Sequence, residues 1–374
     1  MFDVIVLGVG GVGSAALWRL ARRGLNVLGI DQFDPPHNQG SSHGATRLIR
    51  QAYFEHPSYV PLTQHAYRLW AELEALSGER LFEKTGILQV GPSDGHVLPG
   101  VLRSAREHTL PVEQLTSEQV VERWPAFRVP ENLSAVYEQN AGFLHVERSV
   151  AACRAAAESS GAQVLVNSLV VDWSYDAQCV RVRTEHEEWH AERLIIAGGA
   201  WAGGLLKELG LGLTIRRKSL FWFAAPAGHS PSDMPPYLFE LPEGVFYGLP
   251  AIDDLGVKVG DHSAGTLLGK PEEINREIAP EEEAAVQGFL KQCLPGVSDQ
   301  RTAHSTCYYT MSPDEHFMVD LHPQSPRVAF AAGLSGHGFK FTPVLGEALA
   351  NLVMDHATDL PVGFLALNRC NSAS

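Results

Sequence analysis

A glycine-rich turn close to the N-terminus constrains the fold of this 374-residue chain more than any other feature. Residues 2–7 form a largely apolar run, and Gly8, Gly10 and Gly13 follow it with the spacing G-x-G-x-x-G. In a dinucleotide-binding unit the first glycine permits a tight turn, the second lets the backbone approach a pyrophosphate, and the third lets the helix pack on the strand. The pattern predicts a strand, a phosphate-binding turn and a helix in succession.

The residues after this turn complete a strand–helix–strand unit. We predict a helix over residues 14–23, a stop at Gly24 and a second strand over residues 27–30. Such a connection is right-handed, so both strands lie parallel in one sheet beneath the helix. Asp31 follows about 20 residues after the turn, where a carboxylate accepts a hydrogen bond from a ribose hydroxyl. We therefore expect a bound dinucleotide, although these residues do not distinguish FAD from a nicotinamide cofactor.

Composition and cysteine spacing exclude several classes of protein. The formal net charge is -14 and no stretch clusters lysine and arginine, so a nucleic-acid partner is not expected. The sequence shows no basic leader and no apolar run long enough to span a bilayer, which predicts a cytoplasmic protein without a membrane partner. The five cysteines lack the spacing of a zinc site and indicate free thiols and no metal: Cys153, Cys179, Cys293, Cys307 and Cys370.

The length of the chain and its later apolar runs predict two domains. Residues 194–201 repeat the order of strand, glycines and helix, which makes a second dinucleotide contact plausible. Aromatic-rich runs between residues 220 and 260 are typical of antiparallel strands. We predict an α/β fold in which a Rossmann-like cofactor-binding domain comprises residues 1–83, 145–214 and 316–374. A discontinuous α+β substrate domain with an antiparallel sheet is expected to comprise residues 84–144 and 215–315.

Five stretches of the chain carry motifs that are specific to one group of enzymes. They are residues 2–13, 31–37, 42–50, 313–317 and 333–341. Along essentially its whole length the chain resembles the monomeric sarcosine oxidase and N-methyltryptophan oxidase family, FAD-dependent amine oxidases of the D-amino acid oxidase-like group. The resemblance implies that the dinucleotide is FAD, and it implies the roles of the site residues that follow.

Three basic residues in the motif at 42–50 form a candidate anion site. His43 and Arg47 are four residues apart and Arg50 is three residues further, so on a helical turn the three side chains would share one face. By resemblance, His43 and Arg47 lie against the flavin ring, and Arg50 binds the carboxylate of the substrate through its fork of donors. The alternative from the residues alone is a solvated basic face.

Two further motifs carry candidate cofactor contacts. Cys307 aligns with the family's cysteine that forms a thioether to the flavin ring, whereas without the resemblance a buried structural cysteine is the alternative. The glycine-rich loop 333–338, which contains Gly336, is expected to bring backbone N–H groups close to the flavin pyrimidine. Lys340 follows this loop, and by resemblance it contacts both the cofactor and the substrate carboxylate.

Three residues of the aromatic-rich segment complete the set. By resemblance Lys258 helps oxygen to accept electrons, because a cation near the flavin stabilises the negative charge that develops on oxygen. A strand lysine is more commonly an exposed, solvated residue. Tyr247 and His262 align with an aromatic residue and a histidine that line the family's substrate cavity, and each of them is also compatible with simple packing.

The resemblance implies oxidative demethylation of an N-methyl amino acid of the sarcosine or N-methyl-L-tryptophan type. The products are the primary amino acid, formaldehyde and hydrogen peroxide, and the enzyme is expected to be a monomer. Ala45, Leu238 and Leu249 depart from the family pattern and leave the substrate side chain open. Three alternatives stay open: a flavin oxidase of a cyclic imino acid or a glycated amino acid, an amine dehydrogenase with an acceptor other than oxygen, and a dinucleotide-binding protein without turnover.

Overall fold

The computed structural model describes residues 1–263 and 265–371, with only the backbone of residues 370 and 371. Ala264 and residues 372–374, which the sequence analysis assigns to the two predicted domains, lie outside the described residues, and so does the side chain of Cys370. The other four cysteines are free thiols. No helix in the part of the chain that the structure describes is long and apolar enough to cross a membrane.

The predicted N-terminal unit forms the centre of an eight-stranded sheet. Its parallel strands follow the order β20 (Ser325–Ala332), β12 (Glu188–Ile196), β1 (Phe2–Leu7), β2 (Val27–Ile30) and β9 (Gln163–Leu165). Both faces of this sheet are buried, which explains why the strands read as apolar runs in the sequence. Antiparallel strands complete the sheet: β10 (Val170–Tyr175), β11 (Val180–Thr184) and β19 (Met318–His322).

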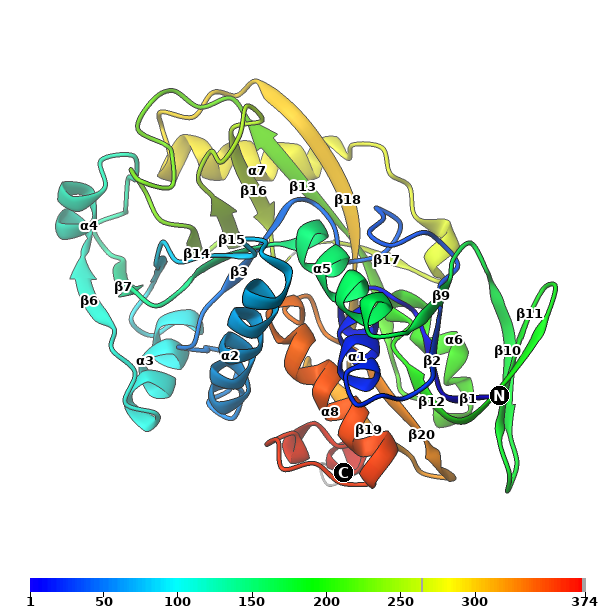
Figure 1. Cartoon of the computed structure of the whole chain (residues 1–374). Helices are drawn as coiled ribbons and strands as arrows, with labels where there is room; N and C mark the ends of the chain where they lie inside the picture. Colours follow the sequence, from blue (N-terminus) through cyan, green and yellow to red (C-terminus); the bar gives the residue numbers. More distant parts are fainter. Residues whose placement is uncertain (264, 372–374) are drawn as a thin grey trace.

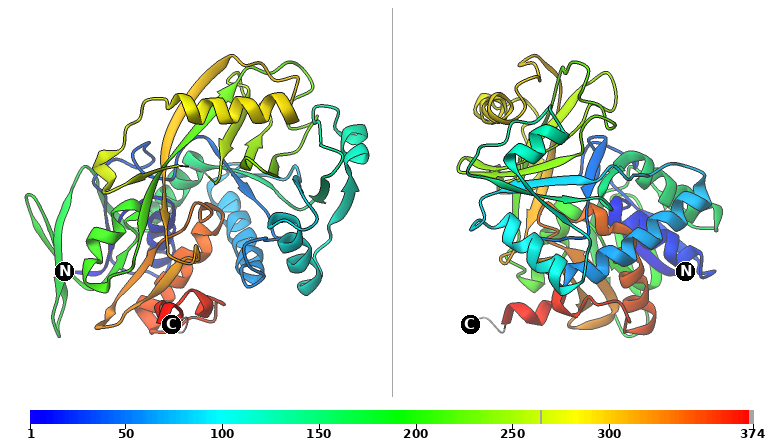
Figure 2. Two further views of the ribbon diagram at one scale, coloured as in Figure 1. Left: turned by 180° about the vertical axis from the view of Figure 1, so that it is seen from behind. Right: turned by 90° about the vertical axis from the view of Figure 1, so that its left-hand side faces the viewer.

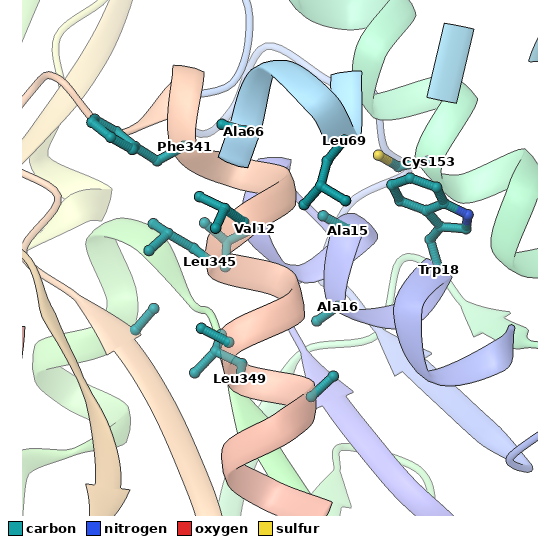
Figure 3. Close-up of a cluster of buried hydrophobic side chains, with 14 of the residues drawn as sticks. Val12, Ala15, Ala16, Trp18, Ala66, Leu69, Cys153, Phe341, Leu345 and Leu349 are labelled. Carbon is teal, nitrogen blue, oxygen red and sulfur yellow. The ribbon is translucent and has the colours of Figure 1, made fainter. Parts of the chain in front are cut away.

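Helices cover one face of this sheet around the buried cluster in Figure 3. The first helix after the glycine turn, α1 (Gly11–Ala21), packs along α8 (Thr342–Asp355) from the far end of the sequence. A Cβ atom at Gly346 of α8 would lie 2.6 Å from the backbone nitrogen of Ala16, so the glycine permits the close approach of the two helices. Helices α2 (Tyr59–Ser77) and α5 (Val146–Ser159) enclose the same cluster.

A second sheet of nine strands arches over the first, as Figures 1 and 2 show. Helix α7 (Pro280–Cys293) packs on its outer face through Phe289 and Leu290, and the opposite face turns toward the site described below. The sequence predicts an antiparallel sheet, and every pair is antiparallel except β14 with β5. The strands are β5 (Ile87–Gly91), β6 (Glu113–Thr116), β7 (Ser134–Glu138), β13 (Thr214–Phe223), β14 (Tyr237–Leu241), β15 (Gly244–Leu249), β16 (Val257–Asp261), β17 (Thr266–Leu268) and β18 (Arg301–Met311).

A third, small sheet corrects one prediction from the sequence. The segment with the three basic residues is not helical, because strand β3 (Thr46–Ile49) pairs antiparallel with β8 (Gly142–His145), which also pairs with β4 (Phe82–Glu83). The remaining helices are α3 (Val97–Glu107), α4 (Ser117–Arg123), α6 (Ala202–Leu205) and the short 3-10 helices η1 (Gly199–Trp201), η2 (Lys207–Leu209), η3 (Pro271–Glu273), η4 (Phe339–Phe341), η5 (Gly363–Leu365) and η6 (Leu367–Asn371).

Candidate functional site

One elongated cavity of about 420 Å³ joins the glycine turn to the second sheet. It begins at the N-terminus of α1, passes the segment 197–201 after β12, and reaches β14, β15 and the loop before α8. The predicted site residues that line it are Gly8, Gly10, Asp31, Arg47, Arg50, Tyr247, His262, Gly336 and Lys340. Four other predicted site residues do not line it: Gly13, His43, Lys258 and Cys307.

Two glycines of the N-terminal turn, Gly8 and Gly13, meet a steric requirement. Gly8 has a φ of 83°, and a Cβ atom there would lie 2.6 Å from the carbonyl oxygen of Ala197. A Cβ atom at Gly13 would lie 1.7 Å from the carbonyl oxygen of Gly8, closer than any contact allows. The first N–H groups of α1 lack intrahelical acceptors, and with the helix dipole they make the cavity end an anion site. A dinucleotide phosphate fits this end.

We expect Gly13→Ala to lose dinucleotide binding and to lower the melting temperature. The added methyl group forces α1 away from β1, and overpacking of this kind costs about 1–3 kcal/mol or more. Cofactor content and thermal unfolding check this result. Gly288→Ala in α7 is the matched control, because nothing lies within 4 Å of that Cβ position and alanine favours a helix. Equal cofactor content in the Gly13→Ala protein and the wild type would contradict the steric argument.

Asp31 holds the glycine turn in place. One of its carboxylate oxygens accepts a hydrogen bond from the Val9 N–H at 2.7 Å, and the other accepts one from the Phe33 N–H at 2.9 Å. A carboxylate oxygen has more than one lone pair, so Asp31 keeps acceptor capacity toward the cavity that it lines. The contact with a ribose hydroxyl stays a prediction.

The turn before β3 determines where the basic residues lie. Gly44 has a φ of 90° and Ala45 has a φ of 65°, and both N–H groups donate to one carboxylate oxygen of Glu147, at 2.7 and 3.1 Å. Arg47 lies on the strand that follows, and its guanidinium donates to the carbonyl oxygens of Thr46 and Ser41 at 2.9 and 3.1 Å. Strand geometry, and not a shared helical face, therefore presents Arg47 to the cavity.

Arg50 lies just beyond β3 and is paired with a carboxylate that the sequence analysis missed. Its Nη2 donates to both carboxylate oxygens of Glu55, at 2.8 and 2.7 Å, and its guanidinium stacks over the rings of Tyr53 and Phe54. Burial raises the pKa of Glu55, but Arg50, followed by His337 and Lys340, outweighs burial and lowers that pKa to about 2. Glu55 also lines the cavity. No local spacing signals this pair.

Lys340 and Gly336 line the cavity together with Arg50. The Lys340 side chain is buried, and its Nζ donates to the carbonyl oxygen of His337 at 2.8 Å. Burial, and then Arg50, hold the pKa of Lys340 below its usual value, whereas Glu55 acts in the opposite direction. Gly336 has a φ of 80°, and a Cβ atom there would lie 2.3 Å from the ring of Tyr309.

Lys258 is buried behind β3 and is not the exposed strand lysine that its sequence context commonly indicates. Its Nζ donates to the carbonyl oxygens of Gly44 and Thr46 at 2.6 and 2.7 Å and lies 5.3 Å from the centre of the Trp222 ring. Burial, and then the charge of Arg47, lower the pKa of Lys258. The buried Lys258 and the partly exposed Arg47 thus form a pair of basic groups at the wall of the cavity.

His43 and Cys307 lie against the same wall. The ring of His43 is buried, its Nδ1 lies 3.3 Å from Ser305 Oγ, and its Nε2 has no hydrogen-bond partner among the described residues. Burial, followed by Arg47, lowers the pKa of His43 to about 3. Cys307 on β18 is 1% exposed and interacts electrostatically with Arg47, Lys218 and Lys258. An unpartnered buried nitrogen and a thiol among cations fit a polar, anionic cofactor ring.

Two tyrosines and a histidine close the end of the cavity on the second sheet. His262 Nδ1 lies 3.2 Å from the hydroxyl of Tyr309, and the rings of Tyr247 and His262 meet edge to face. Burial lowers the pKa of His262 to about 3 and raises that of Tyr247 to about 12, so both side chains are neutral at pH 7. Leu238, one of the departures from the family pattern, lines the same wall, whereas Leu249 is buried behind it.

Residues 1–263 and 265–371 contain no group of three or more His, Cys, Asp and Glu side chains placed to hold a metal ion. The groups that line the cavity include basic, aromatic and backbone groups and the carboxylate of Glu55, which pairs with Arg50. These groups comprise an anion site at one end of the cavity and a cationic cluster with one carboxylate at the other.

Comparisons with known proteins give a consistent result. Residues 3–352 match the family model described as FAD dependent oxidoreductase. The chain is 38% identical to monomeric sarcosine oxidase from Bacillus sp. (strain B-0618), with 98% of this chain and 96% of the relative covered. It is also 38% identical to N-methyl-L-tryptophan oxidase from Yersinia pestis (strain Pestoides F), with 98% and 99% covered. The solved open form of NikD, an unusual amino acid oxidase essential for nikkomycin biosynthesis, has the same fold, with a TM-score of 0.87 at 24% identity over 98% and 97% of the two chains.

Proposed function

This chain belongs to the FAD dependent oxidoreductase family, and we propose that it oxidises the secondary amine of an N-methyl amino acid with oxygen as the electron acceptor. The products are the primary amino acid, formaldehyde and hydrogen peroxide. The observation that carries this proposal is the single cavity, which connects the glycine turn to Arg50 and Lys340. Such a cavity suits a dinucleotide at one end and a small carboxylate at the other.

Arg50 and Lys340 bind the substrate carboxylate in this proposal. Glu55 occupies only Nη2 of Arg50, and the Nε of Arg50 is buried without a partner among the described residues. A guanidinium has five N–H donors in its plane, so the donors on one edge can hold Glu55 while those on another edge hold a substrate. Together with Arg47, the cluster retains positive charge after Glu55 is counted, which favours an anionic ligand.

Orientation is the main contribution of the protein to the reaction. Bound FAD would supply the electron-accepting chemistry, with oxygen as the final acceptor reduced to hydrogen peroxide. Water would then hydrolyse the oxidised amine to the primary amino acid and formaldehyde. The basic side chains of Arg47, Arg50 and Lys340 disfavour a further positive charge on the substrate amine. They therefore lower the pKa of the amine and favour its unprotonated form. Tyr247 and His262, which are both neutral at pH 7, form the cavity wall beside the substrate amine.

An activity assay tests the proposed reaction. The purified protein is incubated with sarcosine, N-methyl-L-tryptophan and pipecolate, and hydrogen peroxide and formaldehyde are measured. We expect peroxide and formaldehyde in equal amounts from an N-methyl substrate. Peroxide without formaldehyde, from pipecolate alone, would support oxidation of a cyclic imino acid instead. Reduction of the flavin without peroxide would support a dehydrogenase.

We also propose that Cys307 carries FAD covalently. A thioether forms through attack of the cysteine sulfur on the flavin ring. Cys307 is buried beside the cavity wall, among the basic side chains of Arg47, Lys218 and Lys258. After acid precipitation we expect a yellow pellet whose intact mass exceeds that of the chain by one FAD. Cys307→Ser is expected to lose this added mass entirely, whereas Cys179→Ser, which changes a partly exposed free thiol, is expected to keep it. Flavin in the supernatant of the wild-type protein would refute the linkage.

A further inference from the structure

A chain of hydrogen bonds runs from a backbone carbonyl through His337 and Tyr53 to Lys340. The Nε2 of His337 lies 3.1 Å from the carbonyl oxygen of Glu315, and its Nδ1 lies 2.6 Å from the hydroxyl of Tyr53. The Nζ of Lys340 lies 3.3 Å from that hydroxyl and 2.8 Å from the carbonyl oxygen of His337. All three side chains are buried, and Tyr53 does not line the cavity. Tyr53 therefore reaches the cavity through lining residues, with its hydroxyl bonded to His337 and Lys340 and its ring beneath Arg50.

The donor and the acceptor of each hydrogen bond in this chain follow from the group at its start, the carbonyl oxygen of Glu315. The carbonyl oxygen of Glu315 can only accept, so the Nε2 of His337 carries the hydrogen. Burial lowers the pKa of His337 to about 4, so the ring is neutral at pH 7 and its Nδ1 is an acceptor. The hydroxyl of Tyr53 then donates to Nδ1, and its oxygen is left to accept from Lys340.

This direction determines how the donors of Lys340 are used. A lysine ammonium has three N–H donors, and two are held by the oxygens of Tyr53 and His337. The third is free to serve a ligand in the cavity that Lys340 lines. Because burial and Arg50 both disfavour the charged form of Lys340, each acceptor also helps to keep the ammonium charged.

We propose that Tyr53, oriented by His337, is a positioning residue that directs the third donor of Lys340 toward the substrate carboxylate. This inference rests on the proposed function, because it concerns how the same cavity recognises an amino acid. Tyr53 touches neither substrate nor cofactor in this scheme; its hydroxyl acts through the hydrogen bond from Lys340, and the ring beneath Arg50 is unchanged in the test below.

The test replaces the hydroxyl of Tyr53 and keeps its ring. Tyr53→Phe retains the ring packing against Tyr59 and Phe341 but removes the acceptor for Lys340. Loss of one hydrogen bond to a charged group changes a binding constant by about tenfold. We expect the holoenzyme variant to show a KM for the N-methyl substrate raised about tenfold, with kcat changed less than threefold. A KM within twofold of the wild-type value would overturn the proposal.

A matched control separates positioning from general loss of stability. Tyr59 belongs to the same aromatic cluster and is equally buried, but its hydroxyl lies 3.2 Å from His316 Nδ1 and accepts from the Phe317 N–H, away from Lys340. We expect Tyr59→Phe to lower the melting temperature and to leave KM unchanged. An equal rise of KM in Tyr59→Phe and Tyr53→Phe would show a structural effect and would overturn the proposal.

A pair of variants at His337 provides the rescue experiment. The side-chain oxygen of asparagine takes the position of Nδ1, so His337→Asn keeps an acceptor for Tyr53, whereas His337→Ala removes it. We expect KM in His337→Ala to match that in Tyr53→Phe, and KM in His337→Asn to be closer to the wild-type value. Equal values for the two His337 variants would contradict the orienting role.

Binding of propionate and propionamide, measured by calorimetry on the holoenzyme, tests the inference apart from turnover. Tyr53→Phe is expected to raise the dissociation constant of propionate about tenfold and to leave that of propionamide unchanged, because only propionate is charged. If the wild-type protein oxidises no N-methyl amino acid but propionate shows this loss, the proposed reaction fails and the positioning role stands. The positioning role fails if Tyr53→Phe and the wild-type protein bind propionate with equal affinity. It also fails if neither protein binds propionate.

Discussion

Arg50→Met is expected to lower kcat/KM for an N-methyl amino acid roughly a thousandfold. The substitution removes the proposed donor for the substrate carboxylate and leaves the part-buried Glu55 carboxylate without its arginine partner, so that its charge repels the substrate. Truncating one partner of a desolvated, hydrogen-bonded charge pair in a complex costs about 2–5 kcal/mol of binding free energy, and each 1.4 kcal/mol is a factor of about ten. Peroxide production over a range of substrate concentrations gives the value. We expect most of the loss in KM.

Two companion variants make this result specific. In the double variant Arg50→Met/Glu55→Gln the unpaired charge is absent. We therefore expect its kcat/KM to be about tenfold higher than that of Arg50→Met. Arg103→Met removes an arginine from an exposed pair with Glu107, where such pairs contribute little, and no change in kcat/KM is expected. A KM for Arg50→Met within threefold of the wild-type value would refute carboxylate recognition by Arg50.

Lys258→Met is expected to slow the reaction of the reduced enzyme with oxygen roughly 100- to 1000-fold. Negative charge develops on oxygen as it accepts electrons, and removal of one buried charged donor from such a site commonly costs a factor of this size. Lys258 is held beside the cavity wall by the carbonyl oxygens of Gly44 and Thr46, which gives its charge a fixed place. Stopped-flow mixing of the reduced protein with oxygen measures the rate directly.

Anaerobic reduction by the substrate is the internal control for Lys258→Met. We expect that rate to fall much less, because Lys258 does not line the cavity and the residues proposed to bind the substrate carboxylate, Arg50 and Lys340, are unchanged. The melting temperature of the variant should also fall, since two buried carbonyl groups lose their donor. An unchanged oxygen rate in a folded variant would exclude Lys258 from this step.

The N-terminal dinucleotide unit could be predicted from the sequence because its signals are local. The glycines of the turn, the apolar run before it and the helix after it lie within about 20 residues of one another. Their steric reasons, such as the clash of any Cβ atom at Gly13 with Gly8, involve neighbours in the same unit. The aromatic-rich strands of the second sheet could be predicted for the same reason, since alternation of side chains is a short-range property.

The segment with the basic residues marks where local reasoning failed. Spacings of three and four residues are compatible with one helical face, but over so few residues they do not distinguish a helix from a strand that ends in a bend. Pairing of β3 with β8, about 100 residues away, decided the outcome. Arg47 and Arg50 reach one cavity because Arg50 lies just after the strand and not within it.

Local patterns predict the strand, glycine turn and helix for a dinucleotide, and the motifs of the sequence identify the family. Long-range contacts in the folded protein, by contrast, pair Glu55 with Arg50, bury Lys258 behind β3, and bond Tyr53 to His337 and Lys340. Tyr53 and Lys340 are 287 residues apart. A contact over that distance depends on the order of strands in the sheets and the packing of helices on them, and no local periodicity encodes either.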